Sequence, residues 1–239
     1  MLTISEAINR RISTRTFTGQ AVPDGLLEEL CADSPTLTVL DPAALGSGRV
    51  GTYGIIKGRP RYVAVAADDL LQAGIEGERL VVELTRRGLA TCWISGTFNH
   101  TLTRRTAGRD IAAVIAVGYA APRAGLIERV MRSAVHARSR RPLSELIIAG
   151  SLPEHLAEAV EAIRLAPSAC NRQPWRLAFN PSGSVDIFGD PKDSMLLLDC
   201  GIGLCHFMLI QPDYHLEPNT GTHPGLTPIA TLVPNNSNT

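Results

Sequence analysis

The sequence predicts an α+β fold in which one chain holds two related halves. Residues 69–87 show apolar side chains at helical spacing, which is typical of an amphipathic helix. Residues 61–67 and 111–119 are short apolar runs bounded by turn-forming residues, which is typical of buried strands. Similar motifs also recur roughly 130 residues apart, which indicates an internal repeat.

The elements of the first half follow from local signals. Residues 3–11 predict a short helix, because Thr3 is a suitable N-cap and Glu6 occupies the capping-box position. Gly88 is expected to end the long helix at 69–87. The other predicted elements of this half are a helix at 25–32, loops with a short strand at 34–60, a strand at 61–67, an apolar segment at 91–94 and a strand at 111–119.

The second half begins after a basic segment at 129–141. Residues 199–210 are nearly all apolar, which predicts a helix buried on every side. The remaining predicted elements are a helix at 153–165, a hairpin of 175–180 with 185–188, a strand at 229–233 and a disordered end at 235–239.

Composition excludes several classes of protein. The chain has 239 residues, 44% of them hydrophobic, as expected of a folded globular protein. Lys and Arg together number 23, as do Asp and Glu, and this balance argues against a nucleic-acid or membrane-surface binder. The sequence shows no apolar leader and no membrane span, which predicts a cytoplasmic protein. Its five cysteines include no CxxC pair, so reduced thiols are expected. Cys205-His206 lacks partner ligands at metal-site spacing, so no metal is expected.

The repeat consists of two pairs of motifs. Arg10-Arg11 followed by VPDGLLEEL is echoed by Arg140-Arg141 followed by LPEHLAEAV, at an offset of 140 − 10 = 130. Ala73-Gly74-Ile75 corresponds to Cys200-Gly201-Ile202, at an offset of 200 − 73 = 127. Two similar offsets in the same order predict a duplication.

Three segments are candidates for a functional site. Residues 10–17 (RRISTRTF) hold three arginines, whose planar donor groups suit phosphate oxygens, although a solvated basic turn would look the same. Residues 129–141 are basic without aromatic residues, so a charged surface explains them better than nucleic-acid binding does. Residues 166–175 (APSACNRQPW) place polar side chains between two prolines, which suits either a binding turn or the end of a helix.

The last of these segments closely resembles the APSxxNxQPW signature of the nitroreductase superfamily. RRISTRTF followed by VP resembles the superfamily's RRSxRxF…VP motif, GLATCWISG at 88–96 resembles GLGTCWIxG, and RRPL at 140–143 resembles RKPL. The order is unusual, because CADSPTLTVL stands where APSxxNxQPW would normally occur. This order resembles the nitroreductase subgroup in which one chain, with two nitroreductase-like halves, mimics the family's homodimer.

The resemblance implies a three-layer α/β/α sandwich that binds FMN. It implies one unit over residues 1–239, with a pseudo-half 1–149 on the phosphate and flavin N5 side and a pseudo-half 150–239 on the PSACNRQPW side. One complete pocket is then expected, with its mirror site lost. Because the second half replaces the partner subunit, the chain is expected to be a monomer. The balanced charge predicts that it binds neither nucleic acid nor membrane.

The expected phosphate contacts come from the two basic segments. Arg15, Arg138 and Arg140 are expected to neutralise the FMN phosphate. Arg11 is expected at the pyrimidine edge of the flavin, where a cation stabilises the anionic reduced ring. Ser13 is expected to bond the ribityl or phosphate oxygens.

The expected ring contacts come from both halves. The backbone N–H groups of Ser95 and Gly96 are expected to donate to flavin N5 and O4, with Ile94 packed on one face. No side chain is assigned a catalytic role, because the flavin carries the chemistry. The expected contacts from the second half are Pro167, Ser168 and Asn171.

The function implied is an FMN-dependent oxidoreductase, a nitroreductase that takes hydride from NADH or NADPH. Its acceptors would be nitroaromatics, quinones or similar small molecules. Two other functions are compatible with the sequence. One is a flavin-binding carrier or sensor without turnover, and the other is a flavin-free interaction partner with the same fold.

Overall fold

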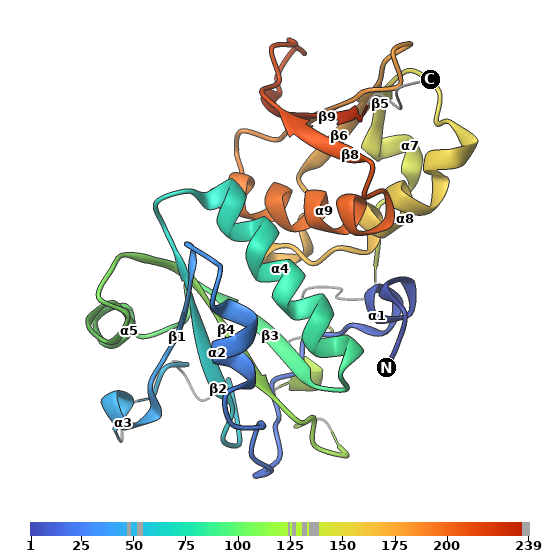
Figure 1. Ribbon diagram of the computed structural model, residues 1–239. Helices are drawn as coiled ribbons and strands as arrows, with labels where there is room; N and C mark the ends of the chain where they lie inside the picture. The colour runs from blue at the N-terminus through green and yellow to red at the C-terminus, as the bar shows by residue number, and fades with distance from the viewer. Residues whose placement is uncertain are drawn as a thin grey trace.

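The structure is a computed structural model that describes residues 1–46, 49–51, 55–123, 125, 128–130, 133 and 139–235. Figure 1 shows one sheet in each half of the molecule, with two long helices packed between the sheets. The predicted α+β class is therefore confirmed. Within the described ranges, no helix is long and apolar enough to cross a membrane.

The first sheet is antiparallel throughout, in the order β1-β2-β4-β3. Val63 and Val65 face one hydrophobic core and Ala64 faces another, as the two-residue period of a strand requires. Helices α2 and α4 cover one face, and α3 and α5 lie on the other. The elements of this half are α1 (Ile4–Arg10), α2 (Leu26–Cys31), β1 (Leu37–Val39), α3 (Pro42–Leu45), β2 (Arg61–Ala66), α4 (Leu70–Arg86), β3 (Ala90–Ser95), α5 (His100–Ala107) and β4 (Ile111–Gly118).

The second sheet has the order β5-β6-β7-β9-β8, with β5 and β6 parallel and the other pairs antiparallel. Its core packs against α8 and α9 around Trp175 and Phe207, which are almost fully buried. The elements of this half are α7 (Leu143–Leu146), β5 (Ile147–Ala149), η1 (Glu154–Leu156), α8 (Ala157–Leu165), η2 (Ala169–Asn171), β6 (Trp175–Phe179), β7 (Val185–Gly189), α9 (Leu196–Ile210), β8 (Tyr214–Glu217) and β9 (Thr227–Pro234).

Helices α4 and α9 join the two halves, and they cross where two glycines meet. A Cβ added to Gly74 would lie 2.3 Å from the carbonyl oxygen of Leu198, and one added to Gly201 would lie 2.2 Å from that of Leu71. These two glycines are the ones paired by the 127-residue offset. Equivalent residues that face one another across a helix crossing are what a two-fold arrangement of duplicated halves requires.

Most predicted elements are present with small shifts. The capping box between Thr3 and Glu6 forms, and Gly88 adopts φ +81° after the end of α4. The helix predicted at 199–210 begins earlier, at Leu196, and the strand β8 was not predicted. The sequence of β8, YHLE, has too few apolar residues to indicate a strand.

Two predicted segments lie partly outside the described residues. Much of the basic segment 129–141, including Arg138, lies outside them, as do residues 236–239. Asn235, which was expected in a disordered end, donates its backbone N–H to the carbonyl oxygen of Asp213 at 2.6 Å. The expected boundary between pseudo-halves falls after β5, which pairs with β6 of the second sheet.

Candidate functional site

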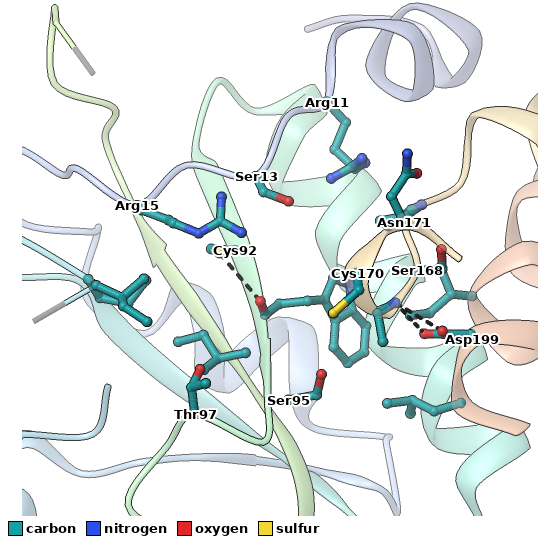
Figure 2. A pocket seen from close by; sticks show the side chains of 18 of the residues that line it. Arg11, Ser13, Arg15, Cys92, Ser95, Thr97, Ser168, Cys170, Asn171 and Asp199 are labelled. Carbon is teal, nitrogen blue, oxygen red and sulfur yellow. Dashed lines mark hydrogen bonds between the residues drawn. The ribbon is translucent and has the colours of Figure 1, made fainter. Parts of the chain in front are cut away.

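A pocket of about 230 Å³ lies where segments from the two halves meet. Figure 2 shows Arg11, Ser13 and Arg15 along one side, and the turn that carries Asn171 along another. The lining residues are Arg11, Ser13, Arg15, Gly51, Ile55, Ile56, Cys92, Trp93, Ile94, Ser95, Thr97, Arg140, Pro167, Ser168, Ala169, Cys170, Asn171, Leu198, Asp199 and Ile202.

The N-terminal segment is held beside β3 by backbone contacts. Ser13 forms a parallel bridge with Thr91, and the N–H of Thr14 donates to the carbonyl oxygen of Thr91 at 2.9 Å. Since successive side chains of an extended chain alternate in direction, Arg11, Ser13 and Arg15 share one side. That side is the pocket wall.

One end of the pocket is strongly cationic. Arg140 donates to Asn171 Oδ1 at 3.1 Å and to the carbonyl oxygen of Leu165 at 3.1 Å. Burial, and then the nearby charges of Arg11 and Arg164, lower the pKa of Arg140 to about 10. This value still leaves Arg140 positively charged at neutral pH, so two guanidinium groups face one small volume. Such an end favours an anionic ligand group.

The turn at residues 167–173 is held in an unusual conformation. Cys170, Asn171 and Gln173 have φ values of +51°, +57° and +50°, in the left-handed region that residues other than glycine rarely adopt. The backbone N–H of Gln173 donates to Ser168 Oγ at 2.9 Å, and Gln173 Oε1 accepts from the N–H of Arg141 at 2.9 Å. These bonds fix the turn against the segment that carries Arg140.

Asp199 is a pocket residue that sequence reasoning missed. It lies on α9 and accepts the backbone N–H of Ala169 at 2.9 Å and 3.1 Å through its two oxygens, as Figure 2 shows. Burial raises the pKa of Asp199 to about 7, with a further rise from Asp193, against the lowering effects of the Ala169 bond and Arg172. A buried carboxyl in an apolar helix was the available signal, but the sequence does not show which way it points.

Stability should depend on this carboxyl. Because its folded pKa is about 7 and its ordinary value is 3.8, the stability it contributes is present below pH 3.8 and is lost as pH rises through about 7. Asp199→Asn cannot ionise and keeps an acceptor for Ala169. It should be more stable than the parent by up to about 4 kcal/mol above pH 7, and the two should converge towards pH 4. Urea unfolding across this range measures the difference.

The control for this prediction is Asp213→Asn, which changes an exposed carboxyl far from the pocket. It should leave the pH dependence of the parent unaltered. A constant difference between Asp199→Asn and the parent at every pH would contradict the prediction.

The structure gathers most of the residues that the sequence predicted for the site. Gly96 is absent from the described lining but directly follows Ser95, and Arg138 lies outside the described residues. The sequence did not single out Trp93, Thr97 or the wall from α9. The predicted residues that line the pocket are Arg11, Ser13, Arg15, Ile94, Ser95, Arg140, Pro167, Ser168 and Asn171.

A second cavity lies between α4 and the segment that includes Ser34, which belongs to the CADSPTLTVL run that stands in the place of the family motif. Its charged lining is Glu29, Asp33, Glu76 and Glu83 with Arg79. Burial raises the pKa of Glu76, but hydrogen bonds from Ser34 and Thr36 lower it by more, to below its usual range. This carboxylate is therefore charged. An acidic cavity repels a phosphate, in contrast to the cationic end of the first pocket.

Comparisons with known proteins agree with this architecture. A family model described as "Putative TM nitroreductase" matches residues 3–211. A "putative nitroreductase" structure from Thermotoga maritima is 22% identical with a TM-score of 0.68, and the match covers 98% of this chain and 94% of that chain. No curated protein sequence matches this chain.

Two further solved structures match over a shorter part of the chain. One, described as a "putative nitroreductase in complex with fmn" from Desulfovibrio desulfuricans, is 23% identical with a TM-score of 0.45, over 64% of this chain and 99% of that one. The other, a nitroreductase family protein from Clostridium difficile, is 20% identical with a TM-score of 0.45, over 64% of this chain and 100% of that one. Because the family model spans most of the sequence, the chain belongs to the nitroreductase family that this model describes.

Proposed function

We propose that this protein binds FMN in the first pocket and transfers hydride from NADH or NADPH to nitroaromatic, quinone or similar acceptors. One observation supports this proposal most strongly. A single pocket between the halves has two arginines at one end and an apolar wall. Membership of the nitroreductase family supports the same reaction class. A monomeric state and a cytoplasmic location are part of the proposal.

The pocket residues suit the parts of FMN. The side chain of Arg11 lines the pocket and is 6% exposed, and its Nε lies 3.8 Å from Glu78 Oε1. A phosphate oxygen would accept from the guanidinium N–H groups that do not face Glu78. Ile94, Leu198 and Ile202 offer apolar surface for an aromatic ring. A volume of about 230 Å³ is below the roughly 300 Å³ of pockets that enclose a small ligand, so part of the flavin would face solvent.

The arrangement of the arginines changes two of the expected roles. Arg11 is close enough to Arg140 for its charge to lower the pKa of Arg140. Figure 2 shows Arg11 on the side of Asn171 and Arg15 farther from Asn171 along the same wall. We therefore assign the phosphate to Arg11 and Arg140 and the pyrimidine edge to Arg15, which exchanges the roles expected of Arg11 and Arg15. The reason is electrostatic, because a dianion is best placed between two neighbouring cations.

Bound FMN would supply hydride acceptance and onward transfer, and the chain would supply binding and orientation. The backbone of Ser95 would place donors at one edge of the ring, with Ile94 packed against its face. The turn at Ser168 and Asn171 would close the pocket from the other half. Asp199 would hold this turn in position through the N–H of Ala169.

The test is a titration of the purified protein with FMN, followed by anaerobic addition of NADH or NADPH. We expect a dissociation constant on the order of 1 µM or lower, bleaching of bound FMN by at least one nicotinamide, and recovery of colour with a nitroaromatic or a quinone. Bound FMN that neither nicotinamide bleaches would favour a flavin carrier or sensor. A protein that takes up no FMN would refute the proposal, and light scattering would test the monomeric state.

A further inference from the structure

A third cavity, of about 660 Å³, lies between α3 and the segment that leads into β2. Its volume falls within the range of about 300–1,000 Å³ that is typical of sites for small ligands. We call it the basic cavity, because the lining that the structure describes includes no Asp or Glu but four cationic residues, Arg49, Lys57, Arg59 and Arg61.

Three of these four charges are not balanced by a carboxylate. Arg61 pairs with Glu28 Oε1 at 2.8 Å. Arg49, Lys57 and Arg59 are exposed, and they form no ion pair with the carboxylates of the described ranges. The basic cavity therefore has a positive potential that attracts phosphate groups, in contrast to the acidic cavity beside α4.

The basic cavity adjoins the first pocket. Gly51 and Ile56 line both of them. The backbone N–H of Lys57 donates to the carbonyl oxygen of Arg15 at 2.8 Å, and the N–H of Phe17 donates to the carbonyl oxygen of Lys57 at 3.0 Å. Since Arg15 lines the first pocket, these bonds join the walls of the two cavities.

A glycine allows this close approach. Gly58 adopts φ +90°, and a Cβ at this position would lie 2.2 Å from the carbonyl oxygen of Phe17. The chain that carries Lys57 and Arg59, on either side of Gly58, thus packs directly against the segment of Arg15. Because Arg15 is the arginine farther from Asn171 in Figure 2, the basic cavity adjoins the end of the pocket opposite the Arg11–Arg140 end.

This placement suits a ligand with a ring at one end and phosphates at the other. The proposed FMN leaves part of its ring facing solvent, where a nicotinamide ring could stack. In NADH and NADPH, a pyrophosphate joins the nicotinamide half to adenosine. Half-buried Leu45, Ile56 and Tyr62 offer apolar surface for the adenine. The lysine and arginines around them suit phosphate oxygens.

The number of unbalanced cations favours one of the two dinucleotides. NADPH differs from NADH by a 2′-phosphate, and a phosphate monoester carries a charge of about −1.5 to −2 at pH 7. Three cations without a carboxylate partner can neutralise this phosphate as well as the pyrophosphate. A site that discriminates against a 2′-phosphate would instead place a carboxylate near it.

We propose that the basic cavity binds the adenosine phosphates of NADPH, with Lys57 and Arg59 at the 2′-phosphate, and thereby makes NADPH the preferred electron donor. This inference rests on the proposed function and specifies its donor. The basic cavity contributes binding only, and no covalent bond changes there.

The experiment is calorimetric titration of the FMN-saturated protein with adenosine 2′,5′-bisphosphate and with adenosine 5′-monophosphate. These two nucleotides differ only by the 2′-phosphate, and neither contains the nicotinamide. At low ionic strength, where exposed charges are least screened, we expect the bisphosphate to bind at least about tenfold more tightly. Equal affinities, or binding of neither nucleotide, would overturn the inference and leave the proposed function intact. A protein that takes up no FMN would overturn both.

Variants locate the site. Lys57→Gln combined with Arg59→Gln should weaken bisphosphate binding by about tenfold or more, and should raise KM for NADPH by a larger factor than KM for NADH. FMN affinity should match that of the parent, because neither residue lines the first pocket. This match also shows that the variant folds.

The matched control is Arg105→Gln, which removes an exposed cation on α5 outside the basic cavity. It should bind the bisphosphate as the parent does. An equal loss in Arg105→Gln would show that overall charge attracts the nucleotide, and an unchanged affinity in the double variant would place the 2′-phosphate elsewhere. Either result would overturn the inference.

Discussion

Replacing Arg140 with Gln is expected to weaken FMN binding by about 100-fold, which corresponds to about 2.7 kcal/mol. Arg140 is half-buried, and bonds to Asn171 and Leu165 hold its guanidinium in place. Its pKa of about 10 reflects burial and repulsion from Arg11, and a bound phosphate would relieve that repulsion. A charge-assisted hydrogen bond in such a place contributes about 1.5–3 kcal/mol.

Fluorescence titration with FMN and with riboflavin tests this prediction, because the two ligands differ by the phosphate. Arg140→Gln should leave riboflavin affinity within about threefold of the parent. The control is Arg104→Gln, because Arg104 pairs with Asp110 at 2.9 Å on the surface and is not part of the pocket lining. Equal losses for FMN and riboflavin would show that Arg140 shapes the pocket and does not bind the phosphate.

The largest expected effect on stability comes from the helix crossing. Gly74→Ala or Gly201→Ala would place a methyl group 2.2–2.3 Å from a backbone carbonyl oxygen of the facing helix, so α4 and α9 would have to separate. Overpacking of this kind costs about 3 kcal/mol, and the gain in helix propensity from Ala offsets about 1 kcal/mol at most. Thermal unfolding should show a midpoint lowered by about 4–12 °C.

Gly203→Ala is the matched control, since it lies on the same helix as Gly201. A Cβ there would lie 3.3 Å from the ring of Trp175, so a shift of a few tenths of an ångström would relieve the contact, and no backbone atom of the facing helix lies in the way. Its unfolding midpoint should stay within about 3 °C of the parent. If Gly74→Ala or Gly201→Ala were as stable as Gly203→Ala, the helices could separate without a loss of stability, which would contradict the prediction. FMN affinity should fall in the crossing variants as well, because the pocket is built from both halves.

Much of the fold could be predicted because its signals are local. The capping box at Thr3 and Glu6 and the stop at Gly88 each depend on a few neighbouring residues. Strand β8 could not be predicted in the same way. It is held by pairing with β9 and by burial of Tyr214, and both interactions depend on distant parts of the chain.

The candidate site also combines features that depend on neighbouring residues with features that depend on distant parts of the chain. By itself, the sequence indicated three of the short segments that line the pocket, since residues 10–17, 88–96 and 166–175 each carry a recognisable motif. The tertiary structure decided which arginines share an end of the pocket, because Arg11 and Arg140 lie 129 residues apart and come close only through the packing of distant segments. It also decided that Glu78 and His206, 128 residues apart, form one buried pair. Local patterns report the conformation of a segment, whereas the charge around a side chain depends on which distant segments pack against it.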